Sequence, residues 1–140
     1  VSTKKQSGGR RMADFKIVVA DPTTGKAKQT EFKDNEADFL MGKSIGDAVS
    51  GDQLGFAGYE FVITGVSDKA GFPMRKDISG TRRVKIYTVA GVGVKKKGKG
   101  LKQRKTVSPN AISEITSQIN LKVTKAGKGP LFEEPEEASE

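Results

Sequence analysis

Hydrophobic and polar residues alternate in four short stretches of this chain. The alternation runs through residues 15–19, 59–64, 84–89 and 119–124. A period of two places every second side chain on the same face of an extended strand. Each stretch therefore predicts a β-strand with one buried and one exposed face.

Turn-forming residues separate these strands. Residues 21–25 read Asp-Pro-Thr-Thr-Gly and precede a polar stretch at 28–32, which predicts a hairpin. Residues 34–41 predict a short helix that begins at an Asp or Asn cap and stops before a glycine. The glycines of residues 43–55 indicate a turn-rich connection, and residues 68–74 indicate a tight irregular loop.

Strand signals dominate this pattern, and helix signals are few. We expect a mostly β fold, a small antiparallel β-barrel-like domain with one or two short helices and basic loops and tails. Closure into a barrel is favoured because it removes exposed sheet edges.

The chain of 140 residues has the length of one ordinary domain. We place that domain at residues 12–128. Residues 1–11 are polar, glycine-rich and basic, and we interpret them as a flexible extension that is either native or left from cloning. Residues 129–140 form an acidic C-terminal tail.

The positive charge of the chain is concentrated in one region. With 25 Lys and Arg against 17 Asp and Glu the formal charge is +8, which favours an acidic partner. No acidic residue occurs between Asp77 and Glu114, and residues 92–105 alone hold seven cations and three glycines. Such a run cannot pack into a core, so its charges are either solvated or held for a partner.

Several classes of function are disfavoured by composition. The chain has no cysteine and no histidine, which removes disulfides, thiolate nucleophiles, zinc ribbons and the commonest general base. No window approaches the roughly 18 apolar residues of a membrane span, and no secretory signal is evident. We expect a soluble intracellular protein that is not an enzyme and has no cofactor, no metal and no small-molecule substrate.

The nucleotide and carboxylate motifs are weak. Residues 91–93 begin like a dinucleotide fingerprint, but the third glycine is misplaced, and residues 126–130 lack the rest of a phosphate loop. Asp47, Asp52 and Asp68 lie among turn residues, where capping is the default role of a carboxylate.

The basic region is best interpreted as an RNA-binding loop. Glycine lets the backbone approach an irregular surface, and each Lys or Arg can displace a counterion from a phosphate. The candidate RNA-binding residues are Arg82, Arg83, Lys85, Lys95, Lys96, Lys97, Lys99, Lys102, Arg104 and Lys105. Further candidates outside this run are Arg10, Arg11, Lys69 and Arg75. The alternative interpretation is a solvated linker between strands.

Recognition of individual bases has less support. An RNA-recognition motif carries two or three aromatic residues on its sheet face for stacking, and no basic-aromatic string of that type occurs here. Phe15, Tyr59 and Phe61 lie at alternating strand positions where burial in the core is the simpler account, whereas Phe72 and Met74 are less easily assigned.

The sequence resembles the small-subunit ribosomal protein S6e family of archaea and eukaryotes. The resemblance covers residues 12–127 and is carried by residues 39–52, 58–65 and 67–74, the last of which ends Gly-Phe-Pro-Met. The Arg-Arg-Val run that begins at Arg82 and the Lys/Gly-rich segment ending at Val107 add to it. This order of motifs is more specific than any single basic run.

The resemblance implies a mostly β, barrel-like body docked on small-subunit ribosomal RNA. It also implies a structural and assembly role without enzymatic activity, neighbouring ribosomal proteins as further partners, and a location in the ribosome in the cytoplasm. The chain departs from the family pattern at Val66, where a second glycine is usual, and at Ser108–Pro109, where Arg-Gly is frequent. The acidic tail replaces the long basic helix of eukaryotic members, so the chain looks like the short archaeal form.

Two other classes of function stay open at this point. One is a free-standing RNA-binding protein or RNA chaperone, which would share the charge but not the ribosome. The other is a protein-interaction module whose acidic tail and basic loop bind different partners.

Overall fold

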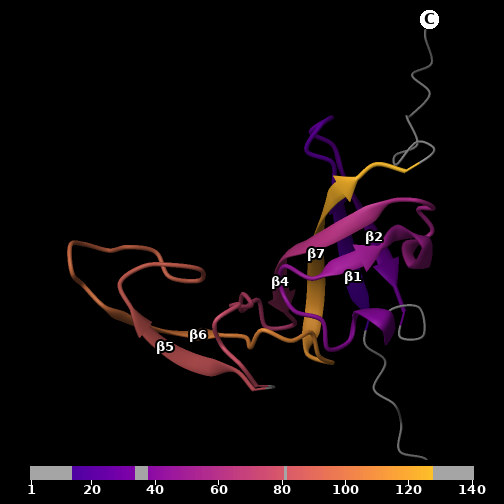
Figure 1. Cartoon of the computed structure of the whole chain (residues 1–140). Helices are drawn as coiled ribbons and strands as arrows, with labels where there is room; N and C mark the ends of the chain where they lie inside the picture. The colour runs from indigo at the N-terminus through magenta and orange to yellow at the C-terminus, as the bar shows by residue number, and fades with distance from the viewer. Residues whose placement is uncertain (1–13, 34–37, 81, 128–140) are drawn as a thin grey trace, which may run out of the picture.

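The computed structural model describes residues 14–33, 38–80 and 82–127, which form a β-rich body and a projecting arm (Figure 1). Residues 1–11 and 129–140, including Arg10 and Arg11, lie outside this part. The described chain contains two 3-10 helices, η1 and η2, and seven strands. In chain order the elements are β1 (Phe15–Ala20), β2 (Ala27–Phe32), η1 (Asp38–Leu40), β3 (Ala48–Ser50), η2 (Gly51–Leu54), β4 (Glu60–Asp68), β5 (Val84–Thr88), β6 (Gln103–Val107) and β7 (Thr116–Lys125).

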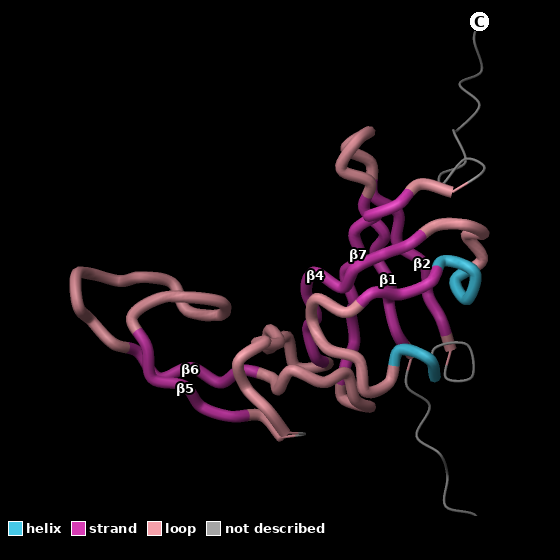
Figure 2. The backbone as a smooth tube through the Cα atoms, viewed as in Figure 1, coloured by secondary structure: helices cyan, strands magenta, loops and turns pink. Residues whose placement is uncertain are grey.

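Five strands form one open sheet in the order β2-β1-β7-β4-β3 (Figure 2). The mostly β fold is confirmed, but the barrel-like closure is not, because β2 and β3 are the unpaired edges of this sheet among the described strands. The expectation of a purely antiparallel sheet was also wrong, since β1 runs parallel to β7. The physical reason for the open sheet is that, within the described part of the chain, β5 and β6 pair with each other and not with the five-stranded sheet.

The core lies on one face of this sheet. Phe15, Ile17 and Val19 of β1 are buried, as the alternation predicted, and Ile17 lies beside Ile119 of β7. Phe61 stacks on Tyr59 with 6.1 Å between ring centroids. Because these strands present alternate residues to the same side, a short stretch of sequence builds a continuous apolar layer.

An irregularity in β4 changes this alternation. Ile63 and Val66 are both buried although they are three residues apart, and the pairing with β7 shifts register between Ile63 and Gly65. A bulge of this kind returns the following side chains to the core face. Val66, one of the departures from the family pattern, therefore lies inside a strand.

The short connections differ in part from the predictions. The hairpin of β1 and β2 is confirmed, and Asp21 accepts hydrogen bonds from the backbone N–H groups of Thr23 and Gly25. The expected helix at 34–41 is described only as η1, because residues 34–37 lie outside the described part. The predicted turn-rich connection contains η2 and β3.

Candidate nucleic-acid interface

The basic region forms an arm, which we define as residues 84–107. It consists of β5, β6 and the connection between them, and it projects from the body as a two-stranded ribbon (Figure 1). The predicted loop at 92–105 was therefore partly wrong, since Gln103, Arg104 and Lys105 belong to β6. These residues are polar, so hydrophobic alternation gave no sign of the strand.

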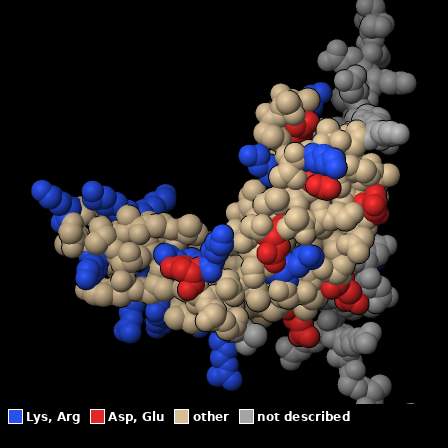
Figure 3. Space-filling view, viewed as in Figure 1, with Lys and Arg blue, Asp and Glu red and all other residues tan. Residues whose placement is uncertain are grey.

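Eight cations of the arm are exposed, and none of them forms an ion pair with the described residues. All eight were candidates from the sequence: Lys85, Lys95, Lys96, Lys97, Lys99, Lys102, Arg104 and Lys105. Figure 3 shows Lys and Arg side chains projecting from the arm, whereas the body carries both signs of charge. The positive charge of the arm is thus uncompensated and available to a partner.

The strand register places cations on both faces of the ribbon. Tyr87 pairs with Arg104 and Lys85 pairs with Thr106, so these four side chains share one face. Lys105 lies on the opposite face, paired with Ile86. Because the body covers neither face along most of the ribbon, phosphates can approach from two sides (Figure 1).

The connection between β5 and β6 is folded where it returns toward the body. Val94 is buried at the base of the arm, with only 5% of its surface exposed. Gly93 has φ of 80°, and a Cβ at this position would lie 2.8 Å from Pro73, so only glycine fits here. Further along, Gln103 Nε2 donates to the Lys95 carbonyl at 2.6 Å. At least one glycine of the basic region therefore serves the fold of the arm.

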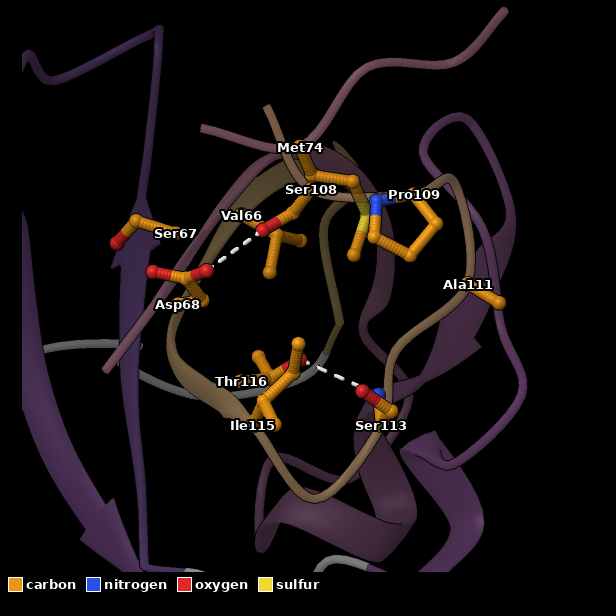
Figure 4. A pocket seen from close by; sticks show the side chains of 10 residues that line it. All are labelled: Val66, Ser67, Asp68, Met74, Ser108, Pro109, Ala111, Ser113, Ile115 and Thr116. Carbon is orange, nitrogen blue, oxygen red and sulfur yellow. Dashed lines mark hydrogen bonds between the residues drawn. The ribbon is translucent and has the colours of Figure 1, made fainter. Parts of the chain in front are cut away.

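A buried carboxylate joins the arm to the body. Asp68, at the end of β4, accepts hydrogen bonds from Arg83 Nε at 2.6 Å and from Ser108 Oγ at 2.8 Å. Arg83 precedes β5 and Ser108 follows β6, so one carboxylate holds both ends of the arm. Figure 4 shows the Asp68 carboxylate directed at the Ser108 hydroxyl, near Val66 and Met74.

The charge state of Asp68 follows from these contacts. Burial opposes ionisation of the carboxyl, but the hydrogen bonds from Arg83, Ser108 and the Phe72 backbone N–H outweigh it and lower the pKa of Asp68. The Ala70 backbone N–H also donates to this carboxylate at 2.9 Å. Asp68 therefore caps its loop, as its sequence context indicated, and in addition anchors the arm.

Two of the predicted cations are engaged at this junction. Arg83 is paired with Asp68, and its guanidinium lies 5.3 Å from the centre of the Phe72 ring. Arg75 is paired with Asp77 at 2.9 Å and donates to the Val92 carbonyl at 3.5 Å. Both arginines hold the base of the arm in place.

The remaining candidate RNA-binding residues, and the position Ser108 that departs from the family pattern, lie around the same junction. Lys69 and Arg82 are exposed and flank the contact between Asp68 and Arg83 in sequence. Ser108 is buried. Met74 belongs to the core, whereas Phe72 is half-buried beneath Arg83.

Asp47 and Asp52 have capping roles. Asp47 accepts a hydrogen bond from the Ser44 backbone N–H at 2.7 Å, and Asp52 accepts one from the Gly58 backbone N–H at 3.0 Å. The described residues contain no group of three or more acidic side chains arranged to hold a metal ion. Over the same residues, no helix is long and apolar enough to cross a membrane.

Sequence reasoning missed two features of this site. The tie between Asp68 and both ends of the arm joins residues 15 and 40 positions apart, and no local pattern predicts such a contact. Tyr87 is the most exposed large hydrophobic side chain of the described chain, and Lys102 Nζ lies 5.6 Å from the centre of its ring. The alternation at 84–89 predicted a strand here but not that both of its faces are open.

The chain is similar in sequence to known ribosomal proteins over most of its length. The family profile described as ribosomal protein S6e matches residues 15–134. A small ribosomal subunit protein eS6 from Methanoculleus marisnigri is 44% identical over 132 residues, which covers 92% of this chain and 100% of the relative. The eS6 of Methanosphaera stadtmanae is 45% identical over 129 residues, covering 90% of this chain and 98% of the relative.

A third relative shows a similar degree of identity. The eS6 of Archaeoglobus fulgidus is 45% identical over 121 residues, covering 86% of this chain and 94% of the relative. The chain thus matches these short archaeal proteins along nearly their whole length, as the order of motifs predicted. The family profile matches both the body and the arm, and the relatives are 44–45% identical to this chain. The chain therefore belongs to the ribosomal protein S6e family.

Proposed function

We propose that this chain is a structural protein of the small ribosomal subunit and that its arm binds ribosomal RNA phosphates. The proposed RNA contact rests on the eight exposed cations of the arm, which form no ion pair with the described residues. The relatives are named small ribosomal subunit proteins, which supports the assembly in which that contact is made. We therefore assign this chain a structural rather than an enzymatic role.

The arm would act by neutralising phosphates on more than one RNA segment. Each Lys or Arg that contacts a phosphate releases a condensed counterion, and the release favours binding at low salt. Because the cations lie on both faces of the ribbon, the arm can lie between two RNA helices and lower the repulsion that opposes their packing. Shape, rather than base identity, would determine most of the specificity.

The body would hold the arm in position and contact neighbouring ribosomal proteins. Arg83 and Arg75 form ion pairs with Asp68 and Asp77, respectively, so we assign both arginines to anchoring the arm. Arg82 and Lys69 extend the exposed positive charge to the base of the arm. Arg10 and Arg11 stay predictions from sequence alone.

Sedimentation of native extract through sucrose gradients at low and high salt tests this function. We expect about one copy of the protein per small subunit, retained until the salt concentration is high. A protein that stays at the top of the gradient at every salt concentration would instead be a free-standing RNA-binding protein or RNA chaperone.

A further inference from the structure

Tyr87 is an aromatic side chain that the arm leaves open. It is 68% exposed, whereas the other tyrosine of the chain, Tyr59, is buried in the core. An aromatic ring on a solvated ribbon contributes little to a core, and large exposed apolar groups commonly mark a binding surface. We therefore expect the exposed ring of Tyr87 to contact a binding partner.

The surroundings of Tyr87 are cationic. Arg104 is its direct partner across the ribbon, and Lys85 shares its face two residues earlier in β5. Lys102 Nζ lies 5.6 Å from the ring centre. No acidic residue occurs in the arm, so this face combines one open aromatic ring with three cations and no negative charge.

We propose that the Tyr87 ring is a stacking platform for an unpaired RNA base, while Lys85, Lys102 and Arg104 bind the adjoining phosphates. This inference rests on the proposed function, because it specifies the kind of RNA that one face of the arm binds. Every base has a π-face, so an aromatic ring beside cations binds single strands with little sequence preference. A regular duplex keeps its bases stacked inside and offers this ring only its backbone.

A packing role for Tyr87 makes different predictions. A cross-strand contact between Tyr87 and Arg104 would stiffen the ribbon whether or not RNA is present. In that case any change at Tyr87 would alter the arm for all RNA probes equally. The stacking role depends on the aromatic ring and on the presence of a base.

The test uses the full chain and three probes of equal length. These are a single-stranded oligoribonucleotide, a duplex RNA, and a single strand in which the central nucleotides are abasic. Tyr87→Ala should weaken single-strand binding by about 5- to 150-fold, the range typical of losing one stacked base. It should barely change binding to the duplex or abasic probes, and it should leave the salt dependence intact because no phosphate contact is lost.

Three further variants separate stacking from bulk. Tyr87→Phe keeps the ring and should bind the single strand like the wild type. Tyr87→Leu keeps an apolar side chain without a π-face and should behave like Tyr87→Ala. Leu101→Ala removes another open apolar side chain of the arm, 58% exposed, and should leave single-strand affinity unchanged.

Fluorescence gives an independent readout. The chain has two tyrosines and no tryptophan, so the emission lost between wild type and Tyr87→Phe reports on Tyr87. The single strand should quench this emission, and the abasic probe should not. Equal losses of affinity for all three probes, or wild-type affinity in Tyr87→Ala, would overturn the stacking platform.

The two proposals fail separately. If Tyr87→Ala binds like the wild type but replacement of the arm lysines weakens all probes, the phosphate-binding arm stands and the stacking platform falls. If replacing the lysines changes nothing, the proposed function of the arm itself is wrong.

Discussion

The body and the arm use strands for opposite purposes. The body buries one face of a five-stranded sheet around residues such as Phe61 and Ile63. The arm is a two-stranded ribbon that carries four of the five exposed large hydrophobic side chains of the described chain, Val84, Tyr87, Val92 and Leu101. The body therefore gains its stability from buried apolar side chains, whereas the arm leaves most of its apolar and cationic side chains exposed.

The junction between these regions combines polar and apolar contacts, since Val94 and Val107 are buried there beside the hydrogen bonds to Asp68. Asp68 joins Arg83 and Ser108 to the end of β4, so charge-assisted hydrogen bonds contribute to the direction of the arm. Such bonds are directional, whereas apolar packing is not. A buried carboxylate can therefore orient a thin ribbon that has almost no core of its own.

Hydrogen exchange should give the largest contrast between the regions. β4 and β7 have hydrogen-bonded neighbours on both sides, whereas β5 and β6 have only each other, and an isolated two-stranded ribbon is marginally stable. We expect amides in the arm ladder to exchange about 1000-fold or more faster than those of β4 and β7. Equal protection in NMR exchange would show that arm and body unfold as one unit.

Replacement of a core aromatic should damage the body alone. Phe61 is 0% exposed and contacts Phe56 and Tyr59, so Phe61→Ala should lower the free energy of unfolding by about 3 to 5 kcal/mol. Leu101→Ala in the arm is the matched control and should change it by less than about 0.5 kcal/mol. Urea titration measures both, and a similar cost for the two variants would contradict the division into body and arm.

Loss of the junction carboxylate should have a smaller effect on stability. Asp68→Asn keeps the size of the side chain and an acceptor for backbone N–H groups but loses the ion pair with Arg83. We expect a cost of about 1 to 3 kcal/mol at neutral pH, measured by urea unfolding. Arg82→Ala is the control, since this neighbouring arginine is exposed and forms no ion pair with the described residues.

The pH dependence of this difference has a definite sign. The pKa of Asp68 is lowered in the folded state, so its contribution is complete above the unfolded pKa of about 3.9. The contribution is lost as the pH falls through the lower folded-state pKa. The gap between wild type and Asp68→Asn should therefore be constant near neutral pH and close below about pH 4. A gap that widens in acid would show that the carboxylate is not stabilised by these bonds.

Removal of arm charge should change RNA affinity but not stability. Lys95, Lys96 and Lys97 are exposed and contribute three potential phosphate contacts. Changing all three to Ala should reduce the slope of log affinity against log salt by about 2 to 3 units. Between 50 and 200 mM salt the wild type should then lose roughly 16- to 64-fold more affinity for RNA than the variant does.

A body variant with the same change in charge provides the control. Lys26, Lys28 and Lys122 are exposed on the body and form no ion pair with the described residues. Their replacement by Ala should leave the salt slope nearly unchanged. Equal slopes for both triple variants would mean that total charge, rather than the arm, determines RNA binding.

Local sequence patterns predicted several strands and the basic character of the protein, but not β3, β6 or η2. Strands at residues 15–19, 59–64 and 119–124 follow from an alternation that only an extended chain can use to bury one face. The concentration of Lys and Arg, the absence of His and Cys, and the motifs of the S6e family are also local properties. Periodicity and composition are enough for such features because they need no knowledge of distant contacts.

How the elements combine follows from contacts that the three-dimensional structure reveals. The alternation at 84–89 resembles that of a half-buried strand, but its partner among the described strands is the polar β6, so the pair leaves the sheet open and forms the arm. The ion pair of Arg83 with Asp68 and the exposure of Tyr87 both depend on this pairing of β5 with β6. Strand pairing and ion pairing join residues far apart in sequence, and local pattern carries no information about which distant partner each residue meets.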